Sequence, residues 1–263
     1  MWPMSRPPSR GFWTPRRRPA CRSASPDGGF CTHERALIVP GGHHRWPEWF
    51  GKGTISRAVA QALGWHLLDS GALYRLVALA GARAGAGLED RRRHAELASA
   101  MQVQFGSGPA GDERVQLAGE DVTAAIRSES AGQGASRVAA WPEVRSALLG
   151  RQRAFAQPPG LVADGRDMGT VVFPGAPLKI FLTASPDERA LRRYKQLKDK
   201  GSGVSLPALS REIAERDARD QTRRVAPLRP ASDACVIDST GMTVEAVVGR
   251  VLELGAARGL WRQ

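Results

Sequence analysis

Beyond the first fifty residues, apolar positions follow two different spacings along the chain. In residues 54–63, Ile55, Val59 and Leu63 recur every four positions, which predicts one apolar face of a helix. Residues 161–163 are instead a short continuous apolar run that ends at Asp164, which predicts a buried strand. Buried apolar strands that alternate with amphipathic helices are typical of parallel α/β sheets.

The same patterns predict the other elements. We expect further helices over residues 70–83, 141–156, 186–200 and 209–224 and from about 244, and strands over residues 65–69, 160–164, 178–182 and 234–238. Weak alternation in residues 103–105 and 114–118, with glycines between them, predicts a small antiparallel insert. The predicted fold is therefore α/β, with a doubly wound, mostly parallel sheet and a small inserted β-containing part.

Composition narrows the possible classes of protein. The chain has 263 residues, 42% hydrophobic and 24% charged, which suits one substantial folded core. Because no apolar run is long enough to span a membrane, we expect a soluble, cytoplasmic protein with no membrane partner. The formal net charge of +12 indicates a polyanionic partner, either nucleic acid or small phosphates.

Residues 1–50 differ in texture from the rest of the chain. They contain eight arginines and no lysine, eight of the 18 prolines and four of the seven tryptophans. An Arg-rich, acid-poor leader could be an organelle transit peptide, although dense prolines suit its amphipathic helix poorly. It could also be a disordered basic arm that binds nucleic acid. A third explanation, an altered reading frame, follows from the motifs.

Three motifs carry the chemistry of the remaining chain. Gly-Lys-Gly-Thr at 51–54 opens a predicted helix, Asp-Ser-Gly-Ala-Leu-Tyr-Arg occupies 69–75, and Asp-Gly-Arg-Asp-Met-Gly-Thr at 164–170 follows a predicted strand. The last motif places a cation and two acids at the carboxyl edge of the sheet, where open α/β proteins bind ligands. Together the motifs resemble those of bacterial cytidylate (CMP) kinases, from about Gly51 to about Glu253.

The resemblance implies a phosphotransferase that moves the γ-phosphoryl group of ATP, bound with Mg²⁺, to CMP or dCMP. It implies a P-loop core over residues 38–258, with the acceptor arm and insert at about 70–157 and a helical lid at about 190–225. We expect a monomer that binds ATP and CMP or dCMP and no nucleic acid.

The phosphate loop departs from the family pattern. The usual string is Gly-Pro-Ser-Gly-Ser-Gly-Lys-Gly-Thr, whose glycines let backbone N–H groups wrap the phosphates. Here residues 46–54 are Trp-Pro-Glu-Trp-Phe-Gly-Lys-Gly-Thr, so Trp46 and Trp49 occupy two glycine positions. The second half of the string matches and the first half does not.

A shifted reading frame explains both tryptophans. Tryptophan has the single codon TGG, and one base later Trp46 before proline becomes GGC and Trp49 before phenylalanine becomes GGT, both glycine. Residues 43–50 can be encoded so that the shifted frame gives Thr-Ile-Asp-Gly-Pro-Ser-Gly, and one restored base before Gly51 adds serine. We therefore expect residues upstream of about Phe50 to be translated out of frame, and residues 1–37 to be an out-of-frame or disordered extension.

On the ATP side, the resemblance implies contacts from Gly51, Lys52, Gly53 and Thr54. Lys52 is the catalytic cation for the β- and γ-phosphates, and Thr54 supplies the hydroxyl toward Mg²⁺. Asp164 is expected to help order Mg²⁺ through water. A helix-capping turn is the structural alternative for the Gly-Lys-Gly-Thr string, and a strand-end cap is the alternative for Asp164.

On the acceptor side, the resemblance implies a CMP site made of Ser70, Arg75, Ser136, Arg145, Arg166, Asp167, Asp220 and Arg223. Ser70 would contact the ribose, and Arg75 and Arg166 the acceptor phosphate; Arg166 is also expected to act in catalysis. Ser136, Arg145 and Asp167 match cytosine-reading positions, because a carboxylate accepts from the exocyclic amino group that uracil lacks. The structural alternative for Asp69 and Ser70 is a simple helix cap.

The lid is predicted from an arginine series on two helices around the glycine-rich turn at 201–203. Its members are Arg192, Arg193, Arg216, Arg219, Arg223 and Arg224. By resemblance, Arg193 and Arg223 act on the phosphates during catalysis and Asp220 touches the ribose, in a lid that excludes water. For most of the series a solvated helix face is the expected role. His66 and His94 are expected to be ordinary packing or surface residues, so no histidine base is predicted.

Two other classes of function stay open at this stage. Because Trp46 and Trp49 replace loop glycines, the chain could be a pseudoenzyme that binds CMP without a working P-loop. It could also be a nucleic-acid-binding protein that uses its basic first fifty residues, which would give a steep salt dependence of RNA binding.

Overall fold

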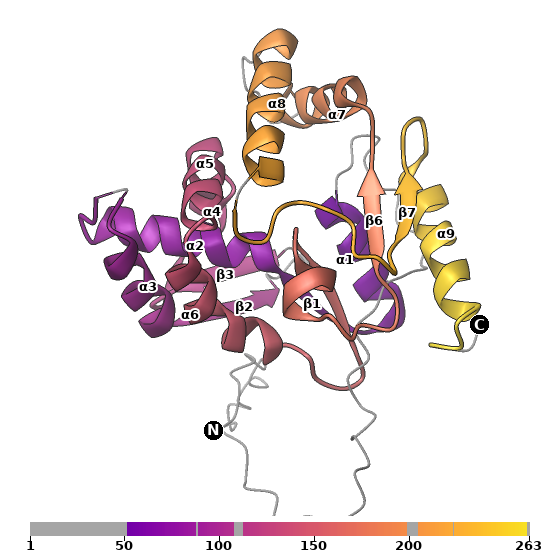
Figure 1. The fold of residues 1–263 in the computed structure, drawn as a ribbon, viewed down its shortest axis with the longest axis horizontal. Helices are drawn as coiled ribbons and strands as arrows, with labels where there is room; N and C mark the ends of the chain where they lie inside the picture. Colours follow the sequence, from indigo (N-terminus) through magenta and orange to yellow (C-terminus); the bar gives the residue numbers. More distant parts are fainter. Residues whose placement is uncertain (1–51, 88, 108–112, 199–204, 223, 262–263) are drawn as a thin grey trace, which may run out of the picture.

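The computed structural model describes residues 52–87, 89–107, 113–198, 205–222 and 224–261. They contain both helices and strands, and at least one helix lies between the two strands of each parallel pair (Figure 1). The helices are α1 (Lys52–Leu63), α2 (Ser70–Arg83), α3 (Arg91–Ala100), α4 (Thr123–Ile126), α5 (Glu129–Val138), α6 (Pro142–Arg153), α7 (Pro186–Lys198), α8 (Leu206–Thr222), α9 (Val244–Ala256) and a π-helical turn, η1 (Met168–Val172). The strands are β1 (His66–Asp69), β2 (Val103–Ser107), β3 (Glu113–Leu117), β4 (Glu120–Asp121), β5 (Leu161–Asp164), β6 (Ile180–Thr183) and β7 (Cys235–Asp238).

Two pairs of strands run parallel. β1 pairs with β5, with Asp69 opposite Asp164 at their carboxyl ends. β6 pairs with β7, with Thr183 opposite Asp238. Parallel strands with intervening helices confirm the predicted α/β class, since such strands need long crossover connections.

The small antiparallel insert is also present. β2, β3 and β4 form a three-stranded sheet in that order, and Val103 lies opposite Leu117. β3 turns into β4 through Ala118 and Gly119, whose φ angles are 50° and 85°. Both residues are thus in the left-handed region, which glycine adopts readily and alanine rarely does. The antiparallel pairing predicted for residues 103–105 and 114–118 is therefore correct.

Helix α1 packs across both parallel strand pairs. Its buried residues Ile55 and Val59 share one apolar cluster with Val162 of β5 and Ile237 of β7. The apolar face of α9 closes the same cluster through its valines, and side chains of β6 pack against it. This shared core places the amino end of α1 close to the carboxyl end of β5.

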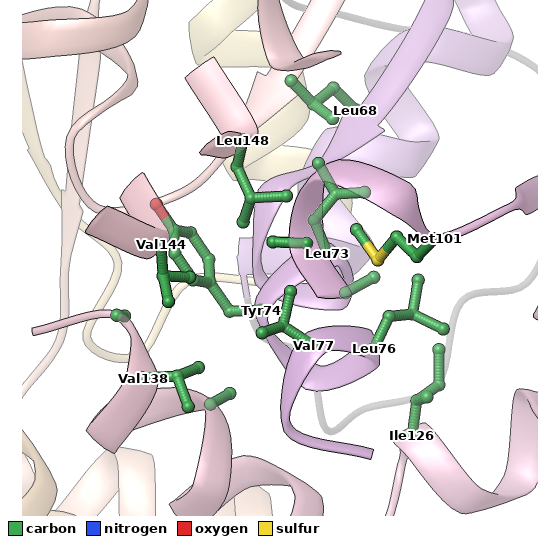
Figure 2. Close-up of a cluster of buried hydrophobic side chains, with 14 of the residues drawn as sticks. Leu68, Leu73, Tyr74, Leu76, Val77, Met101, Ile126, Val138, Val144 and Leu148 are labelled. Atoms are coloured by element: carbon green, nitrogen blue, oxygen red, sulfur yellow. The ribbon is translucent and has the colours of Figure 1, made fainter. Parts of the chain in front are cut away.

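A second core holds the helices that surround the site (Figure 2). Leu73 and Val77 of α2 and Val144 and Leu148 of α6 are fully buried in it. Helix α5 lies close against α2, since a Cβ built on Gly134 would be 3.0 Å from the Cβ of Ala78. Because α2, α5 and α6 share this core, their positions relative to one another are fixed.

Four helical segments were not predicted. The charged helix α3 has only His94 and Ala98 buried, so no apolar stripe marks it. The others are the single turn α4, the glycine- and serine-rich helix α5 and the π-helical turn η1. Each lacks a repeating apolar face, and tertiary packing determines its structure.

The predicted lid corresponds to α7 and α8, which stand together at the top of Figure 1. Helix α8 also approaches α5, where Gln133 Nε2 donates to Glu212 Oε1 at 2.9 Å. The extension predicted at residues 1–37 and the loop positions 46–51 lie outside the described residues. No helix among the residues described is long and apolar enough to cross a membrane.

Candidate active site

The carboxyl ends of the parallel strands gather polar side chains at one edge. β1, β5 and β7 end in aspartates Asp69, Asp164 and Asp238, and β6 ends in Thr183. Asp69 caps α2, because its Oδ1 accepts from the N–H of Ala72 at 3.0 Å. The capping role considered for Asp69 is therefore correct, and it leaves Ser70 at the first position of the helix.

Asp164 lies next to the start of α1. A Cβ built on Gly53 would be 3.6 Å from Asp164 Oδ2, so the strand end and the first turn of α1 are in contact distance. A helix N-terminus favours phosphate, since its first N–H groups are unpaired. Lys52 is the first residue of α1, while its side chain and Gly51 lie outside the described residues.

These residues fit a magnesium ion that arrives with ATP. Within the part of the chain that the structure describes, no group of three His, Cys, Asp or Glu residues is arranged to hold a metal alone. Mg²⁺ bound to nucleotides needs only one or two protein oxygens, because phosphates and water supply the rest. Asp164 and the half-buried Thr54, both near the beginning of α1, offer such oxygens.

One pocket collects almost every residue predicted for the acceptor site. Its empty volume is about 440 Å³, part of which is open to solvent, and Asp220 near the C-terminal end of α8 is part of its lining. Its lining residues are Ser70, Gly71, Tyr74, Arg75, Ala135, Ser136, Ala139, Arg145, Gly165, Arg166, Asp167 and Asp220. Of the predicted acceptor residues, only Arg223 is missing from this lining, and it lies outside the described residues.

A buried ion pair forms one wall of this pocket. Arg145 Nη2 of α6 donates to Asp167 Oδ2 in the turn after β5, and the two side chains are 9% and 3% exposed. Arg145 Nη1 also donates to the Ala139 carbonyl at 3.1 Å, at the C-terminal end of α5. The C-terminal end of a helix attracts cations, which favours this contact. Helices α5 and α6 and the turn after β5 therefore meet at one guanidinium.

A second carboxylate enters the pocket from α8. Asp220 of α8 is 2% exposed, and its Oδ2 accepts from Arg166 Nε. Its Oδ1 accepts from Ser136 Oγ of α5 at 3.4 Å. The structure thus brings together residues 136, 166 and 220, which are far apart in the sequence.

Arg75 reaches the pocket from α2 and is fixed by backbone carbonyls. Its Nη1 donates to the carbonyl of Ile126 at 2.7 Å and to that of Ser128 at 3.2 Å. A Cβ on Gly132 would be 3.3 Å from Arg75 Nη2, so α5 passes close over the guanidinium. The arginine is therefore positioned at the pocket by α4 and α5.

The arginine series of the lid divides into different roles. A solvated face was expected for most of the series, but Arg192 is buried, with 9% of its surface exposed. Its Nη2 donates to the Ser239 carbonyl at 2.6 Å and its Nε to Glu188 at 2.7 Å, which joins α7 to the end of β7. Arg193 is half-buried on α7 and does not line the acceptor pocket. Arg219 and Arg224 are exposed, as expected, and the Arg216 side chain is outside the described residues.

The two histidines of the folded part have packing roles, as predicted. His94 is buried, with Nδ1 2.7 Å from the Asp90 carbonyl and its ring edge-on to Trp141. His66 Nε2 lies 3.0 Å from the Pro158 carbonyl. Neither residue lines the acceptor pocket.

Two residues, one that lines the pocket and one that lies behind Ser70, were given no role from the sequence. The Tyr74 ring lies 5.8 Å from Arg145 Cζ, and its place in the motif at 69–75 could have indicated it. Gln152 of α6 is 1% exposed and donates from Nε2 to Ser70 Oγ at 2.8 Å. Nothing in the sequence around Gln152 marks this contact.

Comparison with known proteins agrees with this arrangement. The family model described as cytidylate kinase matches residues 47–256. The chain belongs to the cytidylate kinase family. Membership of this family confirms the resemblance drawn from the motifs and does not favour a nucleic-acid-binding role for the chain.

Several curated cytidylate kinases are similar to this chain over most of its length. The cytidylate kinase of Pseudomonas savastanoi pv. phaseolicola is 58% identical over 215 residues, which are 81% of this chain and 94% of the relative. That of Stutzerimonas stutzeri is 57% identical over the same shares. That of Pseudomonas paraeruginosa is 58% identical over 207 residues, 78% of this chain and 90% of the relative.

Proposed function

We propose that this member of the cytidylate kinase family transfers the γ-phosphoryl group of MgATP to CMP or dCMP, giving CDP or dCDP. The observation that carries the proposal is the single pocket that joins seven polar residues from α2, α5, α6, α8 and the turn after β5. They are Ser70, Arg75, Ser136, Arg145, Arg166, Asp167 and Asp220. We propose that the chain acts as a monomer in the cytoplasm.

Choice of base is assigned to the buried wall of the pocket. The Asp167 carboxylate would accept from the exocyclic amino group of cytosine, while Arg145 and Ser136 would contact the rest of its polar edge. Uracil has a carbonyl oxygen at the same position, which would face the carboxylate with no proton between them. A buried polar group left without a partner disfavours the wrong base strongly.

Phosphate binding is assigned to the arginines at the open side. Arg75 and Arg166 would hold the acceptor phosphate, and Arg193 and Arg223 would reach the phosphates when the lid closes. Asp220 would contact the ribose. Phosphoryl transfer needs in-line placement and positive charge around the transferred group more than covalent participation. The present geometry, with Arg166 on Asp220, supports a lid that adjusts as the acceptor enters.

ATP is assigned to the first turn of α1. Gly51, Lys52, Gly53 and Thr54 would surround its phosphates, with Lys52 acting on the transferring group. Mg²⁺ bound with ATP would lie near Thr54 and Asp164, the latter acting through water. Support comes from the short separation between Gly53 and Asp164 Oδ2.

We further propose that residues upstream of about Phe50 are translated out of frame. In the described residues, β5 and β6 belong to separate pairs, and the space between them is lined by Ala163, Ile180 and Phe181. Helix α1 packs on both pairs, so a parallel strand that led directly into α1 would fit between them. The shifted frame gives such a segment followed by an intact phosphate loop. The rival proposal is a CMP-binding pseudoenzyme.

The test is phosphoryl transfer by the frame-restored chain, in which the shifted-frame sequence Thr-Ile-Asp-Gly-Pro-Ser-Gly-Ser replaces residues 43–50. MgATP is supplied with CMP, dCMP or UMP, and the diphosphate products are separated by chromatography. CMP and dCMP should be converted well and UMP poorly. Absence of CDP from a folded, frame-restored chain would overturn the proposed function, and resequencing the codons for residues 46–51 decides between a frame error and a pseudoenzyme.

A further inference from the structure

We infer that Gln152, a residue of the helical core, positions the Ser70 hydroxyl as a hydrogen-bond donor to the nucleotide in the acceptor pocket; this inference rests on the proposed function. Gln152 itself is not among the residues that line the pocket. It is therefore a positioning residue that acts through Ser70.

Gln152 occupies a core position of α6. Val144, Leu148 and Gln152 follow one another at intervals of four residues, and all three are buried, Gln152 at 1% exposed. The first two positions of this stripe are apolar, as the core face of a helix requires. Burying an amide at the third position costs free energy unless the amide is hydrogen-bonded.

The hydrogen bond between Gln152 and Ser70 determines which way the hydroxyl can act. Gln152 Nε2 donates to Ser70 Oγ at 2.8 Å, so Ser70 is the acceptor in this contact. A serine hydroxyl has one proton to donate and two lone pairs. Among the residues that the structure describes, no protein group accepts the Ser70 proton, and Ser70 lines the acceptor pocket.

The turn after β5 also packs closely against Ser70. A Cβ built on Gly165 would be 3.1 Å from Ser70 Cβ and 2.9 Å from the Met168 side chain, so little space is left around the serine on this side. Ser70 is also the first residue of α2, directly after the Asp69 cap. With its position fixed by Gly165 and one lone pair taken by Gln152, the hydroxyl is left to donate to an oxygen of the bound nucleotide.

The test uses CMP binding by the chain as written, which does not depend on the ATP loop. Gln152→Met keeps the volume and removes the donor, and Gln152→Glu keeps the shape but can only accept when ionised. Each is measured alone and combined with Ser70→Ala by calorimetric titration with CMP. The matched control is Gln157→Met, since Gln157 is exposed and only donates to the Ala154 carbonyl.

Both Gln152 variants should bind CMP about tenfold more weakly, the effect of one hydrogen bond, while Gln157→Met binds like the parent. In the Ser70→Ala background, Gln152→Met should cause no further loss. Parent-like CMP binding by a folded Gln152 variant, or losses that add fully to that of Ser70→Ala, would show that Gln152 is only structural. A parent chain that does not bind CMP would overturn the proposed function itself.

Discussion

The guanidinium of Arg145 and the carboxylate of Asp167 form a buried pair across the acceptor pocket, between α6 and the turn after β5. Arg145 keeps a second contact to the Ala139 carbonyl, so Asp167 is presented at a fixed place. Removing either partner of such a buried pair would leave the other charge uncompensated, which strongly destabilises the folded state. The same pair is assigned here to the choice of pyrimidine base.

The first prediction concerns that choice. Asp167→Asn keeps the shape of the side chain, but its amide can donate to the carbonyl oxygen of uracil as well as accept from cytosine. The preference of the frame-restored chain for CMP over UMP, measured as a ratio of kcat/KM, should fall by about 1–3 kcal/mol. Equal losses for the two nucleotides would mean that Asp167 serves only the structure.

The second prediction concerns Arg192, which joins α7 to the end of β7. Arg192→Met removes hydrogen bonds to the Ser239 carbonyl and to Glu188 at a buried site. The free energy of unfolding should fall by about 2 kcal/mol, because charged hydrogen bonds to buried groups are lost. The measurement is denaturant unfolding followed by circular dichroism.

A matched control for Arg192 is available on α9. Arg250→Met breaks an exposed pair with Glu253, whose side chains are 56% and 64% exposed. Such surface pairs contribute at most about 1 kcal/mol, so this variant should unfold nearly like the parent. If both variants lost the same stability, the proposed anchor between α7 and β7 would be refuted.

The third prediction concerns Gly165. Gly165→Ala adds a methyl group 3.1 Å from Ser70 Cβ, and the start of α2 cannot move without disturbing its Asp69 cap. Affinity for CMP, measured by titration, should fall about tenfold or more. Gly150→Ala is the control, because a Cβ there meets no neighbouring atom. Unchanged CMP binding by Gly165→Ala would contradict the close contact with Ser70.

The fourth prediction concerns Lys52 in the frame-restored chain. Lys52→Ala should lower the rate of phosphoryl transfer by orders of magnitude, because the charge acts on the transferring group. Folding should change little, since Lys52 begins α1 and the buried face of that helix starts at Ile55. Single-turnover kinetics and thermal unfolding check the two parts separately. A parent-like rate would remove Lys52 from the catalytic assignment.

How much of the fold the sequence predicts depends on where each element gets its stability. Helix α2 was predicted with its observed bounds, because its apolar residues repeat and Asp69 caps it. Helix α5 was missed, because it is rich in small residues and gains its place by close packing of Gly132 on Arg75 and Gly134 on Ala78. Propensity and periodicity do not report such contacts.

The site divides in the same way. Arg145, Asp167 and Asp220 were predicted through the resemblance of their motifs, and all three line the same pocket. Gln152 was not predicted, because its hydrogen bond joins it to Ser70, 82 residues away in the sequence. A solvated face was expected for most of the arginine series, and the sequence could not show that Arg192 would be buried with hydrogen bonds to Ser239 and Glu188.

The most direct test of the account is a pair of separate calorimetric titrations of the 263-residue chain, one with CMP and one with MgATP. The residues that line the acceptor pocket all lie downstream of the altered loop. Trp46 and Trp49, in contrast, occupy loop positions where glycine lets the backbone approach phosphate. We predict clear CMP binding and greatly weakened MgATP binding, with MgATP affinity regained in the frame-restored chain. Tight MgATP binding by the chain as written, or failure to bind CMP, would contradict the account.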